Sequence, residues 1–244
     1  MLQPMTSLPR LLRRLAAASA LGAAATGSLL AQSAAPAPSV AGTAPGDSGV
    51  FVIRHGGDTV ATERFVRTAT ALNGTLAIRN AGGTLQAYQA VVAPDASVAL
   101  IEVTVRESND SGRAAGPPAG RVVQRARVIF KEDSAAVDDI NNNGMQTRIF
   151  ATERGAVPYL NLSFALLEQA VRRARATAPE AALVPFFNLG GGQTVEARLA
   201  RVGTDSVTMA IGNVEFRLRV DPAGRVLGGA VPAQQLVAER VGGT

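Results

Sequence analysis

Apolar and polar residues alternate along much of the chain after residue 50. In "SVALIEVTVRES" (97–108) the two kinds of residue occupy opposite faces, with Ala99, Ile101, Val103 and Val105 against Glu102, Thr104 and Arg106. In "NVEFRLRV" the apolar residues are likewise interleaved with charged ones. A period of two residues is typical of a β-strand that has one dry face and one solvated face.

Other strand-like segments follow one another, separated by turn signals such as "HGGD", "PDAS" and "DPAG". Before mid-chain they are 50–54, 59–70, 72–80, 84–92 and 121–131, and "SAAVDDI" and "MQTRIF" also read as strands. In the last third they are "AALVPFFNL", "TVEARLARV", "DSVTMAI", "NVEFRLRV" and "RVLGGAV". We therefore expect about eleven short strands.

The period changes to about 3.6 in "LNLSFALLEQAVRRARATA". Its apolar stripe is Leu160, Phe164, Leu167, Val171 and Ala174. Glu168 and the arginines lie mostly away from that stripe, and the late arginines suit the negative end of a helix dipole. The pattern predicts one amphipathic helix over residues 161–176, with Asn161 or Ser163 as its N-cap.

These elements predict a mainly β (α+β) fold in a single antiparallel domain over residues 50–241. An apolar sheet face must be covered, and one helix cannot cover about eleven strands spaced roughly 4.8 Å apart. The sheet must therefore curl on itself. A half-barrel around the helix is the simplest arrangement, and a closed barrel or a sandwich is the alternative.

The first 33 residues have the parts of a secretory signal peptide. Arg10, Arg13 and Arg14 precede the apolar run "LAAASALGAAATGSLLA", and the small-residue segment Ala31–Ser33 follows it. Residues 34–49 form a Pro/Ala/Ser/Gly linker that we expect to be disordered. We expect a periplasmic or secreted protein that keeps no transmembrane span after cleavage. An uncleaved membrane anchor is the alternative, although the run is short for one.

Composition excludes several classes of function. The net charge is +5, and three of the arginines belong to the signal segment. Because no basic stripe with interleaved aromatic residues follows, we expect no nucleic-acid partner. With no cysteine and one histidine, we expect neither disulfides nor a zinc site, and we expect no cofactor.

One stretch begins like a calcium-binding loop. In "DDINNNGMQTRIF" the residues Asp139, Asn141 and Asn143 have the spacing of the first ligands, and Gly144 occupies the sharp bend. The twelfth position, which needs a bidentate carboxylate, holds Phe150. Asn-Gly is also a strong hairpin signal, so we favour a tight turn over a weak calcium site and expect no metal ligand.

Candidate catalytic residues are few. "GDSG" (46–49) superficially resembles the nucleophile segment of a trypsin-like protease, but Ser48 and the single histidine, His55, are joined by a short expected strand. "LGGGQT" lacks the lysine of a phosphate loop. The paired carboxylates Glu132/Asp133 and Asp138/Asp139 lie at expected turns. A hydrolase that uses turn carboxylates is a third hypothesis, and we expect no enzyme.

The remaining candidate residues are large and apolar. Tyr88, Phe164, Leu167, Phe186 and Phe187 could line a cleft between the helix and the curled sheet and bind a hydrophobic ligand. The simpler interpretation is that they fill the core.

Many strands, one mid-chain helix and a signal peptide together resemble bacterial envelope half-barrel proteins. These include the periplasmic lipoprotein carriers and uncharacterised secreted β domains that sometimes precede α/β-hydrolases. The resemblance is architectural and covers roughly residues 50–241. It implies an exported, non-enzymatic protein that holds a lipid-like ligand or a partner's apolar segment in its concave face. A structural or interaction module of the envelope, with a filled core, is the alternative.

Overall fold

The computed structural model describes residues 46–79, 83–107, 120–141, 143–178 and 180–243. In the first half of the chain the strands are β1 (Asp47–His55), β2 (Asp58–Arg67), β3 (Ala71–Ile78), β4 (Thr84–Val92), β5 (Val98–Glu107), β6 (Arg121–Phe130), β7 (Ser134–Asn141) and β8 (Gly144–Ala151). The second half contains β9 (Val157–Tyr159), α1 (Phe164–Thr177), β10 (Ala181–Asn188), β11 (Thr194–Val202), β12 (Ser206–Ile211), β13 (Val214–Val220), β14 (Val226–Val231), the 3-10 turn η1 (Pro232–Gln234) and β15 (Leu236–Val241).

The mainly β fold is confirmed, but the count of about eleven strands is wrong because the described residues contain fifteen. No alternating pattern predicted β9 or β15. β9 has only three residues, and β15 directly follows the 3-10 turn η1. β1 also begins at Asp47, three residues before the expected start of the domain, because its first residues pair with the end of β2. The expected leader, residues 1–33, and most of the linker lie outside the described residues.

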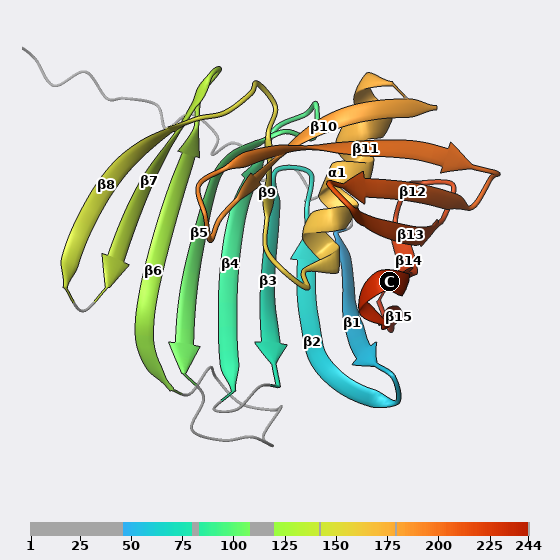
Figure 1. Ribbon diagram of the computed structural model, residues 1–244, viewed down its shortest axis with the longest axis horizontal. Helices are drawn as coiled ribbons and strands as arrows, with labels where there is room; N and C mark the ends of the chain where they lie inside the picture. The colour runs from blue at the N-terminus through green and yellow to red at the C-terminus, as the bar shows by residue number, and fades with distance from the viewer. Residues whose placement is uncertain (1–45, 80–82, 108–119, 142, 179, 244) are drawn as a thin grey trace, which may run out of the picture. The chain divides into compact units, whose positions relative to one another are not determined.

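All fifteen strands belong to one sheet, with the order β8-β7-β6-β5-β4-β3-β2-β1-β15-β14-β13-β12-β11-β10-β9. The chain runs outward from the middle of the sheet to β8, crosses to β9 at the opposite edge, and returns to the middle, where β15 pairs with β1. Every pairing is antiparallel except that of β9 with β10. Because β8 and β9 are not hydrogen-bonded neighbours, the sheet is curled but not closed (Figure 1).

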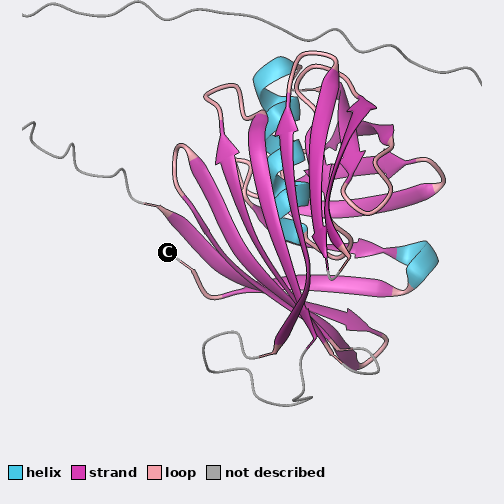
Figure 2. Cartoon of the chain, turned by 90° about the vertical axis from the view of Figure 1, so that its left-hand side faces the viewer, coloured by secondary structure: helices cyan, strands magenta, loops and turns pink. Residues whose placement is uncertain are grey.

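The parallel pair explains why the helix lies on one face of the sheet. Two parallel neighbours need a crossover connection, and in this chain α1 provides it between β9 and β10. Figure 2 shows α1 in the hollow of the curled sheet. It contacts β9, β10, β14 and β2, so the two halves of the sheet meet on one helix.

The helix exists where the sequence pattern predicted it, but it begins at Phe164, three residues after the expected start, and ends at Thr177, one residue after the expected end. Ser163 is the N-cap, and its hydroxyl accepts a hydrogen bond from the Leu166 amide. All eight residues from Phe164 to Val171 are buried, including Glu168, which the pattern placed away from the apolar stripe. The pattern describes a helix with one exposed face, whereas a sheet that wraps around the helix buries nearly all of its first two turns.

Aromatic rings fill the gap where the two ends of the sheet approach each other. The Phe187 ring on β10 lies 5.5 Å from the ring of Phe130 on β6 and 6.0 Å from that of Phe150 on β8. The Thr194 hydroxyl also lies 2.7 Å from the hydroxyl of Thr152, just after β8. Side-chain packing therefore joins the sheet where no backbone ladder does.

We expect the substitution Phe187→Ala to lower the free energy of unfolding by about 3–5 kcal/mol, because it removes a fully buried ring from this packing. Urea denaturation measures the change. Leu183→Ala is the matched control, because Leu183 lies on the same strand but is 55% exposed, and its replacement should cost under about 1 kcal/mol. Equal losses in the two variants would show that the rings do not hold the sheet ends together.

Candidate functional site

A buried ionic cluster lies between α1 and the middle of the sheet. At its centre is the carboxylate of Glu168, which is completely buried. Arg67 Nε on β2 lies 3.2 Å from Glu168 Oε1, and Arg172 Nε on the helix lies 3.1 Å from the same oxygen. The Val226 amide donates to Glu168 Oε2 at 2.9 Å, and Arg240 on β15 lies 3.3 Å from that oxygen. Glu168 thus connects the helix to three strands.

The two arginines of the sheet have further partners. The Arg67 guanidinium donates to the side chain of Gln169 and, at 2.9 Å, to the carbonyl of Ala165. Arg240 donates to Asp47 at 2.5 Å and lies over the ring of Phe65, with 4.9 Å from its Cζ to the ring centre. Because each buried charge faces an opposite charge or a hydrogen-bond acceptor, the cluster satisfies the condition under which ions are tolerated in a core.

A second buried carboxylate, Glu63, binds the N-terminus of α1. It accepts hydrogen bonds from the Tyr88 hydroxyl at 2.6 Å, from the Ser163 hydroxyl at 2.5 Å and from the Ala165 amide at 2.9 Å. A negative charge at this end is favoured by the helix dipole. The Tyr88 ring reaches Glu63 by crossing Gly74, where an added Cβ would lie 2.2 Å from the ring.

Burial controls the ionisation of these groups. Loss of solvent raises the pKa of Glu63 above its ordinary value of 4.5, and the hydrogen bonds from Ser163 and Tyr88 offset only part of that rise. Burial also raises the pKa of the Tyr88 hydroxyl, and the neighbouring Glu63 raises it further. Burial lowers the pKa of Arg67, whereas Glu168 raises it.

The chemistry of the two carboxylates is structural. Glu63, Tyr88 and Ser163 are each at most 1% exposed, so no substrate reaches them in this conformation. The Ser163 hydroxyl also acts as the helix cap. Among the described residues there is no group of three or more His, Cys, Asp or Glu side chains that could hold a metal ion.

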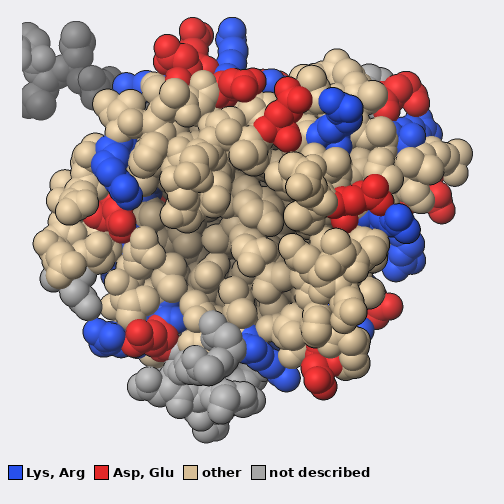
Figure 3. All heavy atoms as spheres, viewed as in Figure 1, with Lys and Arg blue, Asp and Glu red and all other residues tan. Residues whose placement is uncertain are grey.

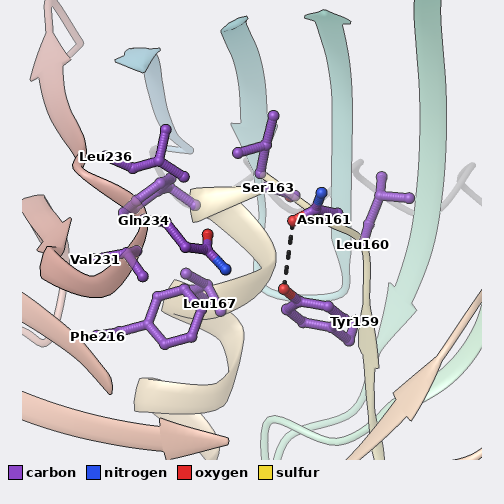
Figure 4. A pocket seen from close by; sticks show the side chains of 11 residues that line it. Tyr159, Leu160, Asn161, Ser163, Leu167, Phe216, Val231, Gln234 and Leu236 are labelled. Carbon is purple, nitrogen blue, oxygen red and sulfur yellow. Dashed lines mark hydrogen bonds between the residues drawn. The ribbon is translucent and has the colours of Figure 1, made fainter. Parts of the chain in front are cut away.

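A small pocket lies at the N-terminal end of α1 (Figure 4). Tyr159 and the turn 160–162 form one wall, Phe164 and Leu167 come from the helix, and the strands and η1 contribute Phe216, Val231, Gln234 and Leu236. Its volume is about 10 Å³. A second pocket, at the C-terminal end of the helix, has a volume of about 20 Å³ and is bordered by Val171, Ala174 and residues of β10–β12. One water molecule needs roughly 10–15 Å³, so neither space holds a larger ligand as it stands.

The five residues predicted to bind a ligand are all buried, and they do not line one cleft. Phe164 and Leu167 border the pocket at the helix N-terminus. Tyr88 belongs to the Glu63 group, Phe186 packs on Tyr159 with ring centres 5.7 Å apart, and Phe187 belongs to the aromatic packing between the sheet ends. Whether any of them binds a ligand stays a prediction.

The concave side of the sheet also has a recess. Figure 3 shows charged side chains around the border of this view and mainly uncharged residues in its hollowed middle. Among the residues on the concave side of the strands, Ile78, Val105, Phe130 and Phe150 are only partly buried and pack against the core.

The candidate catalytic residues do not converge. Ser48 lies near the start of β1, and His55 is exposed at its end. Asp138 and Asp139 are consecutive residues of β7 and therefore point to opposite faces, where Asp138 accepts a hydrogen bond from Thr147 and Asp139 accepts one from Gln124. Neither pair has the shared geometry that acid-base or nucleophilic chemistry requires.

The calcium-like stretch forms the predicted hairpin. Asn141 pairs with Gly144 at the end of the β7–β8 ladder, and the Asn141 side chain accepts a hydrogen bond from the Asn143 amide at 2.8 Å. Gly144 has a φ of +110°, which explains why glycine stands there.

Comparison with known proteins supports the fold. No protein-family model and no curated protein matches the sequence. Two solved structures are similar, each with a TM-score of 0.50. A DUF1089 family protein from Pseudomonas aeruginosa is 11% identical, and the match covers 72% of this chain and 91% of that one. A beta-barrel-like protein of domain of unknown function DUF1849 from Brucella abortus is 10% identical, with 81% and 96% covered.

At this level of identity the likeness concerns the fold alone, and it places the chain among β-barrel-like proteins. The finer resemblance to lipoprotein carriers stays a prediction. Among the described residues, no helix is long and apolar enough to cross a membrane.

Sequence reasoning missed the ionic cluster. A signal was present in β2, where Ala61, Glu63, Phe65 and Arg67 share one face. Charged residues on the same strand face as apolar ones indicate either the edge of the core or a buried ion pair. The partners of Glu63 and Arg67 on α1, however, lie about a hundred residues away in the sequence. The partners could not be identified from spacing.

We expect Glu168→Gln to lower the free energy of unfolding by about 3–5 kcal/mol, because it leaves Arg67 and Arg240 without their shared counter-charge in the core. Glu239→Gln is the control. It breaks the Arg54–Glu239 pair, whose side chains are 39% and 52% exposed, and should cost at most about 1 kcal/mol. Chemical denaturation of both variants at neutral pH tests this, and a loss under 1 kcal/mol for Glu168→Gln would contradict it.

The raised pKa of Glu63 predicts a pH dependence of stability. The folded state binds the proton of the Glu63 carboxyl more tightly than the unfolded chain does. The contribution of protonated Glu63 to the free energy of unfolding is therefore fully present below pH 4.5, and it is lost as the pH rises through the folded-state pKa. The stability difference between wild type and Glu63→Gln should therefore shrink as the pH rises from about 4.5 to 8. Thermal denaturation across this range measures it, and a difference that grows with pH would refute the assignment.

Proposed function

We propose that this protein is an exported, non-enzymatic module of the bacterial cell envelope, which acts by binding another envelope protein through its surface. The observation that carries the proposal is the filled interior, in which the spaces at the two ends of α1 measure about 10 and 20 Å³. Sites for small molecules are usually about 300–1,000 Å³. Spaces this small at the two ends of the helix, in the described part of the chain, favour contact with a protein over the enclosure of a lipid.

Two further observations support a non-enzymatic role. Glu63 accepts a hydrogen bond from the N-terminus of α1 and Glu168 accepts one from the Val226 amide, so these two buried carboxylates serve the fold. Of the carboxylates that the sequence nominated for hydrolysis, Asp138 and Asp139 lie on opposite faces of β7, and Glu132 and Asp133 are exposed just before that strand. The export assignment rests on the sequence of residues 1–33 alone.

A lipid-like ligand is a second candidate, which the recess in Figure 3 favours. Its middle is mainly uncharged, and the partly buried Ile78, Val105, Phe130 and Phe150 offer apolar surface on the concave side. A ligand there would lie in an open trough instead of the closed space beneath the helix.

Purification from the bacterial envelope, combined with mass spectrometry, tests the proposal. The full chain, expressed with its leader, should be recovered as a polypeptide that begins near residue 34, with no bound lipid. Cross-linking in intact cells should join it reproducibly to one envelope protein, and a hydrophobic dye should gain little fluorescence.

Two variants separate the candidates. Val105→Glu places a charge on the concave side of β5, whereas Leu183→Glu places one at an exposed position on β10. Co-purified lipid that is lost from Val105→Glu and kept by Leu183→Glu would overturn the proposal in favour of the lipid carrier. A purified polypeptide that still contains residues 1–33 would contradict the proposed cleavage of a signal peptide and, with it, the export part of the proposal.

A further inference from the structure

The two edges of the sheet are built differently. β9 has three residues, two of them buried, and includes Pro158, which has no amide hydrogen to offer. β8 has eight residues with neither proline nor lysine, and seven of them are exposed. Proteins commonly protect an edge strand by making it short or by adding proline or lysine. The edge strand β9 is therefore short and carries a proline, whereas β8 is a longer edge strand that is able to pair.

Unpaired backbone groups and apolar side chains coincide on β8. In an antiparallel ladder every second residue directs its N–H and C=O away from its neighbour, and β7 is the only described strand that pairs with β8. On the convex face Met145 is 66% exposed and Ile149 is 75% exposed. Ile140, which lies opposite Met145 on β7, is 42% exposed. This edge thus offers both a ladder and an apolar surface.

We propose that β8 pairs antiparallel with β8 of a second copy of this chain, about a two-fold axis through Thr147. The self-complementary sequence of the strand supports this occupant. With Thr147 opposite itself, Met145 of each copy faces Ile149 of the other, and Gln146 faces Arg148. The exposed apolar residues then cover one another, and the one charge of β8 faces a neutral amide.

Other registers are less favourable. In each copy, every second residue of β8 directs its N–H and C=O outward. These groups bond between the copies only in registers that place outward-directed residues of one copy opposite outward-directed residues of the other. An axis through Arg148 would place the two guanidinium groups opposite each other, and like charges in that position are destabilising. An axis through Gln146 would place Ile149 opposite Asn143 and leave its apolar surface uncovered. The centre at Thr147 avoids both faults.

The contact is small. Eight residues at roughly 3.4 Å each give a ladder about 27 Å long, which corresponds to a weak, concentration-dependent association. The inference does not depend on the proposed envelope role, because it concerns only the strand edge and a second copy.

Analytical ultracentrifugation of the protein over a range of concentrations tests the pairing. Wild type should show a reversible monomer–dimer equilibrium, and Ile149→Lys should weaken dimerisation at least tenfold. Val66→Lys is the matched control, because Val66 is also an exposed apolar strand residue, 51% exposed, but lies on β2, where it pairs with β1 on one side and β3 on the other. It should dimerise like wild type. Circular dichroism should show both variants folded.

Single cysteines test the register, since the chain has no cysteine of its own. Thr147→Cys should form a disulfide-linked dimer under mild oxidation, because the two residues would face each other at the axis. Met145→Cys alone should not, but a mixture of Met145→Cys with Ile149→Cys should. Three results would overturn the proposal. The wild type could stay monomeric at all concentrations, the Thr147→Cys variant could fail to cross-link, or the Ile149→Lys variant could dimerise as the wild type does. A monomer that binds an extended peptide of another protein on β8 would replace the second copy with that partner.

Discussion

The attraction between one buried carboxylate and the arginines around it holds the helix inside the sheet. Glu168 has no exposure and interacts with β2, β14 and β15 as well as with its own helix. Ions are expensive to bury unless every one is paired, so the sheet must curl far enough to bring Arg67 and Arg240 to the same point. This condition adds to the need to cover the apolar face of the sheet, which one helix cannot meet unless the sheet curls.

Because the interior around α1 is filled, a binding partner would contact the outer surface of the domain. Side chains occupy the space that a carrier would leave for its ligand, and the remaining pockets at the ends of α1 are about the size of one or two water molecules. What remains available is the uncharged recess of Figure 3 and the outer edge of β8. The likeness to two β-barrel-like proteins of unknown function agrees with this fold and adds no activity.

The path of the chain explains why one edge is exposed. The strands run outward from β1 to β8, and the chain then crosses to start again at the far edge, so the sheet ends at two strands that are close in sequence but not hydrogen-bonded. Aromatic packing around Phe187 joins these ends on the inside. It leaves β8 with β7 as its one described strand neighbour, and Met145 and Ile149 of β8 are exposed.

The sequence alone determined those elements that depend only on residues close together in the chain. The alternation in β5 and β13, the helix with its Ser163 cap and the Asn143-Gly144 hairpin were all predictable, because each depends on residues a few positions apart. The need for a curled sheet also followed, since one helix cannot cover so many strands. Only the tertiary structure decided that β9 and β15 complete the sheet, that the five predicted ligand residues separate into four groups, and that Glu63 and Glu168 are buried. The physical reason is distance along the chain: Glu63 meets Ala165, and Glu168 meets Arg240, only after the sheet has curled.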